Sequence, residues 1–130
     1  MTTNIQLENA ASRLKLKNFR GVFMIDEIDK LTQLGQECGI LASKTSKEDD
    51  MHWTCWFKNG KSKYYFDSFG LTPTKEIIKY LKSPILYSTF QIQQFNEETC
   101  GEWCLYVLDR LNKQEDFTDI ILDVINSSTY

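Results

Sequence analysis

The stretch Met51–Gly70 reads MHWTCWFKNGKSKYYFDSFG and decides how the chain folds. Two aromatic-rich runs lie on either side of Asn59-Gly60, the dipeptide most typical of a tight β-hairpin turn. Such a turn needs positive φ at both central positions, which asparagine and glycine accept more readily than other residues. We therefore expect two antiparallel strands joined by a two-residue type I′ loop at Asn59-Gly60.

This register puts the chain's single histidine beside a carboxylate. With Lys58 facing Lys61, continuing the ladder pairs His52 with Asp67. Directly opposed residues have Cβ atoms roughly 4.5–5.5 Å apart and project from the same face of the sheet. A β-bulge would shift the register and break this inference. The pair fits a catalytic base held by an acid, and it equally fits a surface ion pair without chemistry.

The overall composition is that of a globular domain. The 130 residues carry a net charge of −3 with a pI near 5.2, and 42% of them are hydrophobic. We expect residues 1–130 to form a single domain, because this length supports one hydrophobic core. The acidic balance argues against a large basic nucleic-acid surface, and no apolar run reaches the ~18 residues of a membrane span. Residues 1–8 lack a secretory pattern, so we expect an intracellular chain whose four cysteines are reduced.

Helical and strand patterns flank the hairpin on both sides. Upstream, the sequence predicts a marginal helix or irregular arm over 1–20, a helix over 26–34 capped by Asp26 and ended by Gly35, a buried strand over 38–42 and a polar loop over 44–50. Downstream, it predicts a helix begun by Thr72-Pro73 and stopped by Ser83-Pro84, one or two strands over 85–94, a polar turn over 96–99, and helices over 101–111 and 117–125, the last capped near Asp116. These elements make an α+β domain with a central antiparallel sheet and packed helices.

Cys100 directly precedes the predicted 101–111 helix. A helix N-terminus carries a partial positive charge and unpaired N–H groups, which favour a thiolate and can stabilise an oxyanion. A cysteine in this position, with a histidine oriented by a carboxylate, is the set of groups that a cysteine hydrolase needs. A buried structural cysteine at a helix start is the simpler interpretation, and the residues alone leave both open.

A structural zinc site is a further interpretation to weigh. His52 with Cys55, and Cys100 with Cys104, have spacings that resemble ligand pairs. Residues three apart on a strand point to opposite faces, however, so His52 and Cys55 are not expected to share a metal. Cys104 lies four residues beyond Cys100 on the same helical face, and we interpret it as core filler. We expect no metal and no cofactor.

Three segments, taken in order, carry a family resemblance: HW at 52–53, YYFDSFG at 64–70 and QQFNEETCGEWC at 93–104. They resemble the adenovirus-type cysteine endopeptidases, which belong with the SUMO- and ubiquitin-like-protein proteases in one superfamily. The order histidine, acid, glutamine, cysteine is the family's. So are the aromatic residue and glycine after the acid, and the glycine after the cysteine. Upstream, NFRGVF at 18–23 and ECGI at 37–40 look like segments of the proteases of adenoviruses and Maverick-type virus-like transposons.

The resemblance implies a thiol endopeptidase that trims virion precursor proteins, with a papain-like core permuted in chain order. It implies His52 as the base, Asp67 as its orienting acid and Cys100 as the nucleophile. A glutamine upstream would complete the oxyanion hole. The SUMO-type spacing of six residues before the nucleophile gives Gln94, which we favour, and the adenoviral spacing of seven gives Gln93.

The resemblance also bears on substrates and activators. A narrow entrance to the nucleophile implies glycine just before the cut, and Trp53 beside His52 is a candidate wall of that entrance. Asp67 stands where the adenoviral enzymes have glutamate, and the segment 83–94 lacks the cysteine that would bind an activating peptide. We therefore expect no peptide activator, and the acidic pI argues against strong stimulation by DNA. The expected partners are precursor capsid or core proteins in an infected cell or virion, with no membrane and no strong nucleic-acid binding.

Two other functions remain open. A protease of ubiquitin-like modifiers, such as a pathogen effector, would share the same triad and differ in its substrate cleft. A catalytically inactive module that holds a peptide tail would need no activated thiolate, so a thiol-reactive probe would separate it from an enzyme.

Overall fold

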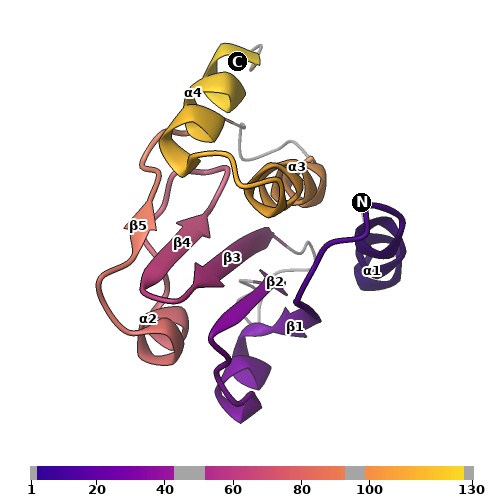
Figure 1. The fold of residues 1–130 in the computed structure, drawn as a ribbon, viewed down its shortest axis with the longest axis vertical. Helices are drawn as coiled ribbons and strands as arrows, with labels where there is room; N and C mark the ends of the chain where they lie inside the picture. The colour runs from indigo at the N-terminus through magenta and orange to yellow at the C-terminus, as the bar shows by residue number, and fades with distance from the viewer. Residues whose placement is uncertain (1–2, 43–51, 93–98, 128–130) are drawn as a thin grey trace.

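The computed structural model describes residues 3–42, 52–92 and 99–127. Its elements are α1 (Asn4–Arg13), β1 (Phe19–Met24), the 3₁₀ helix η1 (Ile25–Lys30), β2 (Gln36–Ala42), β3 (Trp53–Asn59), β4 (Ser62–Phe66), α2 (Lys75–Leu81), β5 (Leu86–Tyr87), α3 (Cys100–Asn112) and α4 (Phe117–Ser127). The five strands form one sheet in the order β1-β2-β3-β4-β5 (Figure 1). No helix within these described ranges is long and apolar enough to cross a membrane.

The sheet is mixed rather than wholly antiparallel. Its centre, β2-β3-β4, is antiparallel as the sequence predicts, but β1 runs parallel to β2 and β5 runs parallel to β4. Parallel neighbours need a crossover connection. η1 lies in the crossover from β1 to β2, and α2 lies in the crossover from β4 to β5. Both crossovers lie on the same face of the sheet, where they bury a second core.

The hairpin forms where predicted, but its register differs from the predicted one by two residues. The loop residues are Gly60 and Lys61, and Lys58 faces Lys63 rather than Lys61. Gly60 alone has a positive φ, +63°, which matches the glycine-first pattern of a type II′ turn. Asn59 stays in the ladder because β2 extends alongside it, and its side-chain oxygen accepts a hydrogen bond of 3.2 Å from Gln36.

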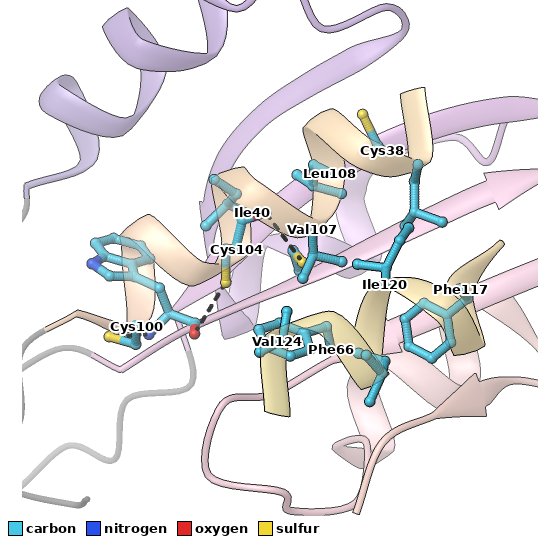
Figure 2. Close-up of a cluster of buried hydrophobic side chains, with 14 of the residues drawn as sticks. Cys38, Ile40, Phe66, Cys100, Cys104, Val107, Leu108, Phe117, Ile120 and Val124 are labelled. Carbon is cyan, nitrogen blue, oxygen red and sulfur yellow. Dashed lines mark hydrogen bonds between the residues drawn. The ribbon is translucent and has the colours of Figure 1, made fainter. Parts of the chain in front are cut away.

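Strand alternation divides the interior into two cores. On one face, α1, α3 and α4 cover a cluster that includes Leu7, Cys38, Ile40, Trp53, Cys55, Phe66, Cys104, Val107, Leu108, Phe117, Ile120 and Val124 (Figure 2). On the other face, η1 and α2 cover Ile28, Leu41, Trp56, Tyr65, Ile77, Tyr80 and Leu81. Even and odd positions of β2 and β3 thus point to different cores, the period of two expected of strands buried on both faces.

Several helices agree with the sequence analysis and two do not. α3 and α4 form as predicted, and the Asp116 carboxylate accepts the Asp119 N–H at 3.3 Å at the start of α4. α1 is a helix with a capping box at Thr3, which decides between helix and arm for this segment. The predicted loop over 44–50 and most of the predicted turn over 96–99 lie outside the residues that the structure describes.

The predicted helix over 26–34 is wrong beyond Lys30. Only the short η1 forms, and Leu31 after it is extended. Two side chains hold this connection open: Arg20 donates to the Thr32 carbonyl at 2.9 Å, and Glu37 accepts the Leu34 N–H at 2.6 Å. The predicted Thr72-Pro73 cap is also wrong, because α2 begins at Lys75 and Pro73 is buried in the loop before it. Of the predicted strand region 85–94, only β5 is regular among its described residues.

Candidate active site

The start of β3, the end of β4 and the start of α3 meet at one end of the sheet. His52 precedes β3, and its Nε2 lies 2.6 Å from Oδ1 of Asp67, which follows β4. The side chain of His52 is 13% exposed and that of Asp67 is 4% exposed. The predicted pairing of the two is therefore confirmed as a contact. It survives the register error because a shift of two residues keeps every side chain on its face.

Phe69 is a member of this group that sequence reasoning missed. Its ring stacks on the His52 ring, with centroids 3.9 Å apart and an interplanar angle of 4°. Its backbone N–H donates to Asp67 Oδ1 at 2.8 Å, so one carboxylate oxygen accepts from both neighbours. The true register provides the signal: continued past Cys55 and Phe66, it places Phe69 opposite His52. The imidazole is thus fixed by a hydrogen bond at one edge and by an aromatic ring on one face.

The turn that carries the acid is packed tightly against the segment after β5. Gly70 has φ +72°, and a Cβ there would lie 2.7 Å from the Thr89 carbonyl oxygen and from the Phe90 carbonyl carbon. Ile92 N–H donates to the Ser68 carbonyl at 2.9 Å. Only glycine fits at position 70, so the turn that carries Asp67 and residues 89–92 hold each other in place.

Cys100 is the first residue of the 13-residue helix α3 and is 5% exposed. The Trp53 backbone N–H donates to its Sγ at 3.4 Å. Helix N-termini and N–H donors both favour negative charge on a sulfur placed there. The predicted position of Cys100 at a helix start is confirmed.

The charge of His52 follows from its neighbours. Burial lowers the pKa of His52, but its hydrogen bonds with Asp67 and Cys100 outweigh burial and raise that pKa to about 9. The ring is therefore an imidazolium at neutral pH, with a carboxylate at one nitrogen and a thiol group in contact. Cysteine nucleophiles are commonly activated by such a cationic partner.

Burial favours the neutral thiol form of two of the other cysteines. Burial raises the pKa of Cys38 to about 12, and burial together with the Cys55 thiol raises the pKa of Cys104 well above its usual value. Cys55 packs in the core beside Cys104, whereas His52 faces Asp67, so the spacing that resembled a zinc pair does not bring ligands together. Across residues 3–42, 52–92 and 99–127, no group of three or more histidine, cysteine or acidic side chains could hold a metal ion.

The remaining predicted site residues are of two kinds. The Trp53 ring is 1% exposed in the core under α3, so its burial gives no support to a wall that faces substrate. What Trp53 presents to the site is its backbone. Gln93 and Gln94 lie outside the described residues, so the choice of oxyanion donor stays a prediction.

Comparison with known proteins supports the fold. No protein-family model matches the chain, and no curated protein sequence matches it. The crystal structure of ASFV pS273R protease is similar, with a TM-score of 0.67 and 16% identity over 97% of this chain and 61% of that one. The crystal structure of its selenomethionine form is similar too, with a TM-score of 0.67 and 15% identity over 93% of this chain and 61% of that one.

The likeness lies in the fold. The expected α+β architecture with packed helices is confirmed, because nearly the whole chain superposes on ASFV pS273R protease. This chain spans about 61% of the length of the protease that it matches.

Proposed function

We propose that this chain is a cysteine-type endopeptidase with Cys100 as nucleophile, His52 as general base and acid, and Asp67 as the group that orients His52. The observation that carries the proposal is the 2.6 Å contact between His52 and Asp67 beside a cysteine at a helix N-terminus. A surface ion pair would not be 4% exposed on its acid side, nor stacked under Phe69. The similarity in fold to a protease adds independent support.

The chemistry follows from these positions. The Cys100 thiolate attacks the scissile carbonyl carbon, and the carbonyl electron pair moves onto oxygen as a tetrahedral oxyanion. His52 gives its proton to the leaving amine, which departs and leaves a thioester on Cys100. Water then attacks the thioester while His52 accepts its proton, and the acid product leaves as the thiolate re-forms. Asp67 stabilises the charged imidazole and fixes its tautomer without itself accepting the proton.

The oxyanion would be held by N–H groups at the start of α3 and by one glutamine, Gln94 in preference to Gln93. Removal of one preorganised donor typically costs ~10²–10³ in kcat. The loss falls on kcat rather than KM, because the charge exists only in the transition state. Gln93→Ala and Gln94→Ala measured side by side identify the donor.

The substrates that we propose are precursor proteins of a virus or virus-like element, cut after glycine. This rests on the sequence resemblance and on the similarity in fold to ASFV pS273R protease. The test is digestion of a peptide library, with Cys100→Ala as the matched inactive control. We expect Cys100-dependent cleavage with glycine before the cut. Preference for large apolar or basic residues there would contradict the specificity, and equal cleavage by Cys100→Ala would contradict the enzyme.

A ubiquitin-like-modifier panel, run in parallel, tests the second candidate function. Cleavage of a folded modifier after its terminal glycine, without cleavage of free peptides, would favour a modifier protease. Absence of cleavage in both assays, together with slow alkylation of Cys100, would favour an inactive binding module.

A further inference from the structure

Two cysteines on one face of α3 hold the same residue of β3. The Trp53 N–H donates to Cys100 Sγ at 3.4 Å, and the Cys104 thiol donates to the Trp53 carbonyl oxygen, also at 3.4 Å. The second bond is the dashed line between the labelled Cys104 and a carbonyl oxygen in Figure 2. Trp53 is thus attached to α3 at its amide and at its carbonyl, one helical turn apart.

These two bonds act on the two peptide planes that flank Trp53. The plane on its N-terminal side is shared with His52, so fixing it limits where the imidazole can lie. β3 packs directly against α3, and few groups in a sheet backbone are available to anchor to a helix, because the ladder uses most of them. A hydrocarbon at position 104 could fill the same space but could not hold the carbonyl.

Cys104 is suited to act as a donor. Its side chain is 0% exposed, and burial keeps its pKa well above the usual value, so it stays a thiol over the working pH range. The Cys55 thiol donates to the backbone carbonyl of Cys104 in a longer contact of 3.9 Å. No redox step is needed for this role.

We propose that Cys104 is a positioning residue for the Cys100–His52 pair. By holding the Trp53 carbonyl, its thiol keeps the Trp53 amide aimed at Cys100 Sγ and keeps His52 beside the nucleophile. The inference deepens the proposed function and rests on it for the role of Cys100. It differs from core filling in one respect: a filler acts through volume, whereas a positioning thiol acts through its S–H bond.

The test compares Cys104→Ala with Cys104→Ser, which differ by a single hydroxyl. The first readout is the rate of Cys100 alkylation by iodoacetamide as a function of pH, with Cys100→Ala as the blank. The second is the split of peptide cleavage into kcat and KM. We expect Cys104→Ala to move the pH of half-maximal alkylation upward and to lower kcat by about ten-fold, the scale of one lost hydrogen bond, with KM unchanged. We expect Cys104→Ser to keep an alkylation profile close to that of the wild type and most of the wild-type kcat.

The matched control is Cys38→Ala. Cys38 is equally buried in the same core, but its sulfur contacts the Lys17 carbonyl and Asn112 instead of Trp53. We expect it to lose stability like Cys104→Ala while its alkylation profile and kcat stay at wild-type values.

Two results would overturn the proposal. One is a Cys104→Ala variant that loses stability only, with wild-type alkylation and kcat. The other is a folded Cys104→Ser variant as impaired as Cys104→Ala. Failure of the proposed function looks different: no cleavage by the wild type, while Cys104→Ala still alters Cys100 alkylation, would refute the protease and leave the positioning role supported.

Discussion

At the scale of single residues, one carboxylate oxygen of Asp67 accepts two hydrogen bonds. Oδ1 accepts from His52 Nε2 at 2.6 Å and from the Phe69 N–H at 2.8 Å. Because the backbone N–H demands an acceptor, an asparagine there would be turned with its oxygen toward both donors. The geometry of the turn would then survive the loss of charge, which separates the orienting role of this residue from its electrostatic role.

Asp67→Ala should therefore be worse than Asp67→Asn. We expect Asp67→Ala to lose ~10²–10⁴ in kcat/KM, by analogy with the hydrolase triad, and Asp67→Asn to lose less because it still orients His52. Steady-state kinetics on one peptide substrate measure both. Equal loss in the two variants would mean that charge alone matters, and wild-type activity in both would remove Asp67 from the site.

The raised pKa of His52 makes stability depend on pH. Burial lowers that pKa, but hydrogen bonds with Asp67 and Cys100 raise it to about 9 in the folded chain, against about 6.5 in an unfolded one. The folded state then binds more protons between these values, so the free energy of unfolding should fall as pH rises from 6.5 to 9. The fall is at most about 3 kcal/mol. Urea unfolding across this range measures it, and Asp67→Asn should flatten the slope. A wild-type stability that rises with pH would contradict the assignment.

At the scale of elements, the acid turn depends on one glycine. Gly70→Ala would force a residue with a side chain into φ +72° and bring its Cβ to 2.7 Å from the Thr89 carbonyl oxygen. We expect a loss of at least about 2 kcal/mol of stability, together with a loss of kcat as the acid moves. Gly35→Ala is the control, because nothing lies within 4 Å of its added Cβ and its φ is ordinary. Thermal unfolding and steady-state kinetics of both variants measure the losses of stability and of kcat. Equal tolerance of the two substitutions would refute the close approach.

The buried carboxylate of Glu37 links four elements on the face of the sheet that η1 and α2 cover. Glu37 in β2 is 1% exposed and accepts from Trp56 Nε1 at 3.0 Å, from the Tyr80 hydroxyl at 2.7 Å and from the Leu34 N–H at 2.6 Å. Arg20 in β1 completes the group at 3.4 Å. Buried donors must be paired, so this acid links β1, β3 and α2 to β2 at a distance from the catalytic residues.

Glu37→Ala should cost roughly 3–5 kcal/mol of folding free energy, because it leaves two buried donors, a part-buried backbone N–H and a cation without their acceptor. Glu8→Ala, which removes an exposed acid of α1, should change stability by less than about 0.5 kcal/mol. Chemical denaturation gives both values. A loss at Glu37 no larger than that at Glu8 would show that water replaces the carboxylate.

The elements also show which features could be predicted from the sequence and which could not. The contact of His52 with Asp67 was predictable because alternation survives an error of two residues, whereas the stacking of Phe69 on His52 needs the true register. The turn type could not be predicted from Asn59-Gly60 alone, because the pairing of Asn59 with Gln36 in a third strand decides it. The open connection after Lys30 likewise depends on the bond from Arg20 to the Thr32 carbonyl and on Glu37, whose other partners Trp56 and Tyr80 lie far along the chain, so no local pattern contains these contacts.

At the scale of the whole molecule, charge predicts the response to nucleic acid. The net charge is −3, so long-range repulsion from phosphates opposes binding. Locally, Lys58 faces Lys63 across β3 and β4, and Lys63 donates to the Lys82 carbonyl at 3.0 Å, so one basic group sits at the hairpin end. Like charges held opposite each other in a ladder are unfavourable, and these two lysines supply only a small counterion-release term against the overall negative charge.

We therefore expect duplex DNA to leave kcat/KM unchanged at low and at physiological salt, measured with the purified chain on a neutral peptide. Low salt gives DNA its best opportunity, because the Debye length is then longest. A Lys58→Gln, Lys63→Gln double variant serves as the control, and it should behave like the wild type with and without DNA. Stimulation by DNA that fades with salt and disappears in the double variant would contradict the expectation and identify the hairpin end as a phosphate-binding surface. Stimulation that persists in the double variant would contradict it as well, and would place the contact elsewhere on the molecule.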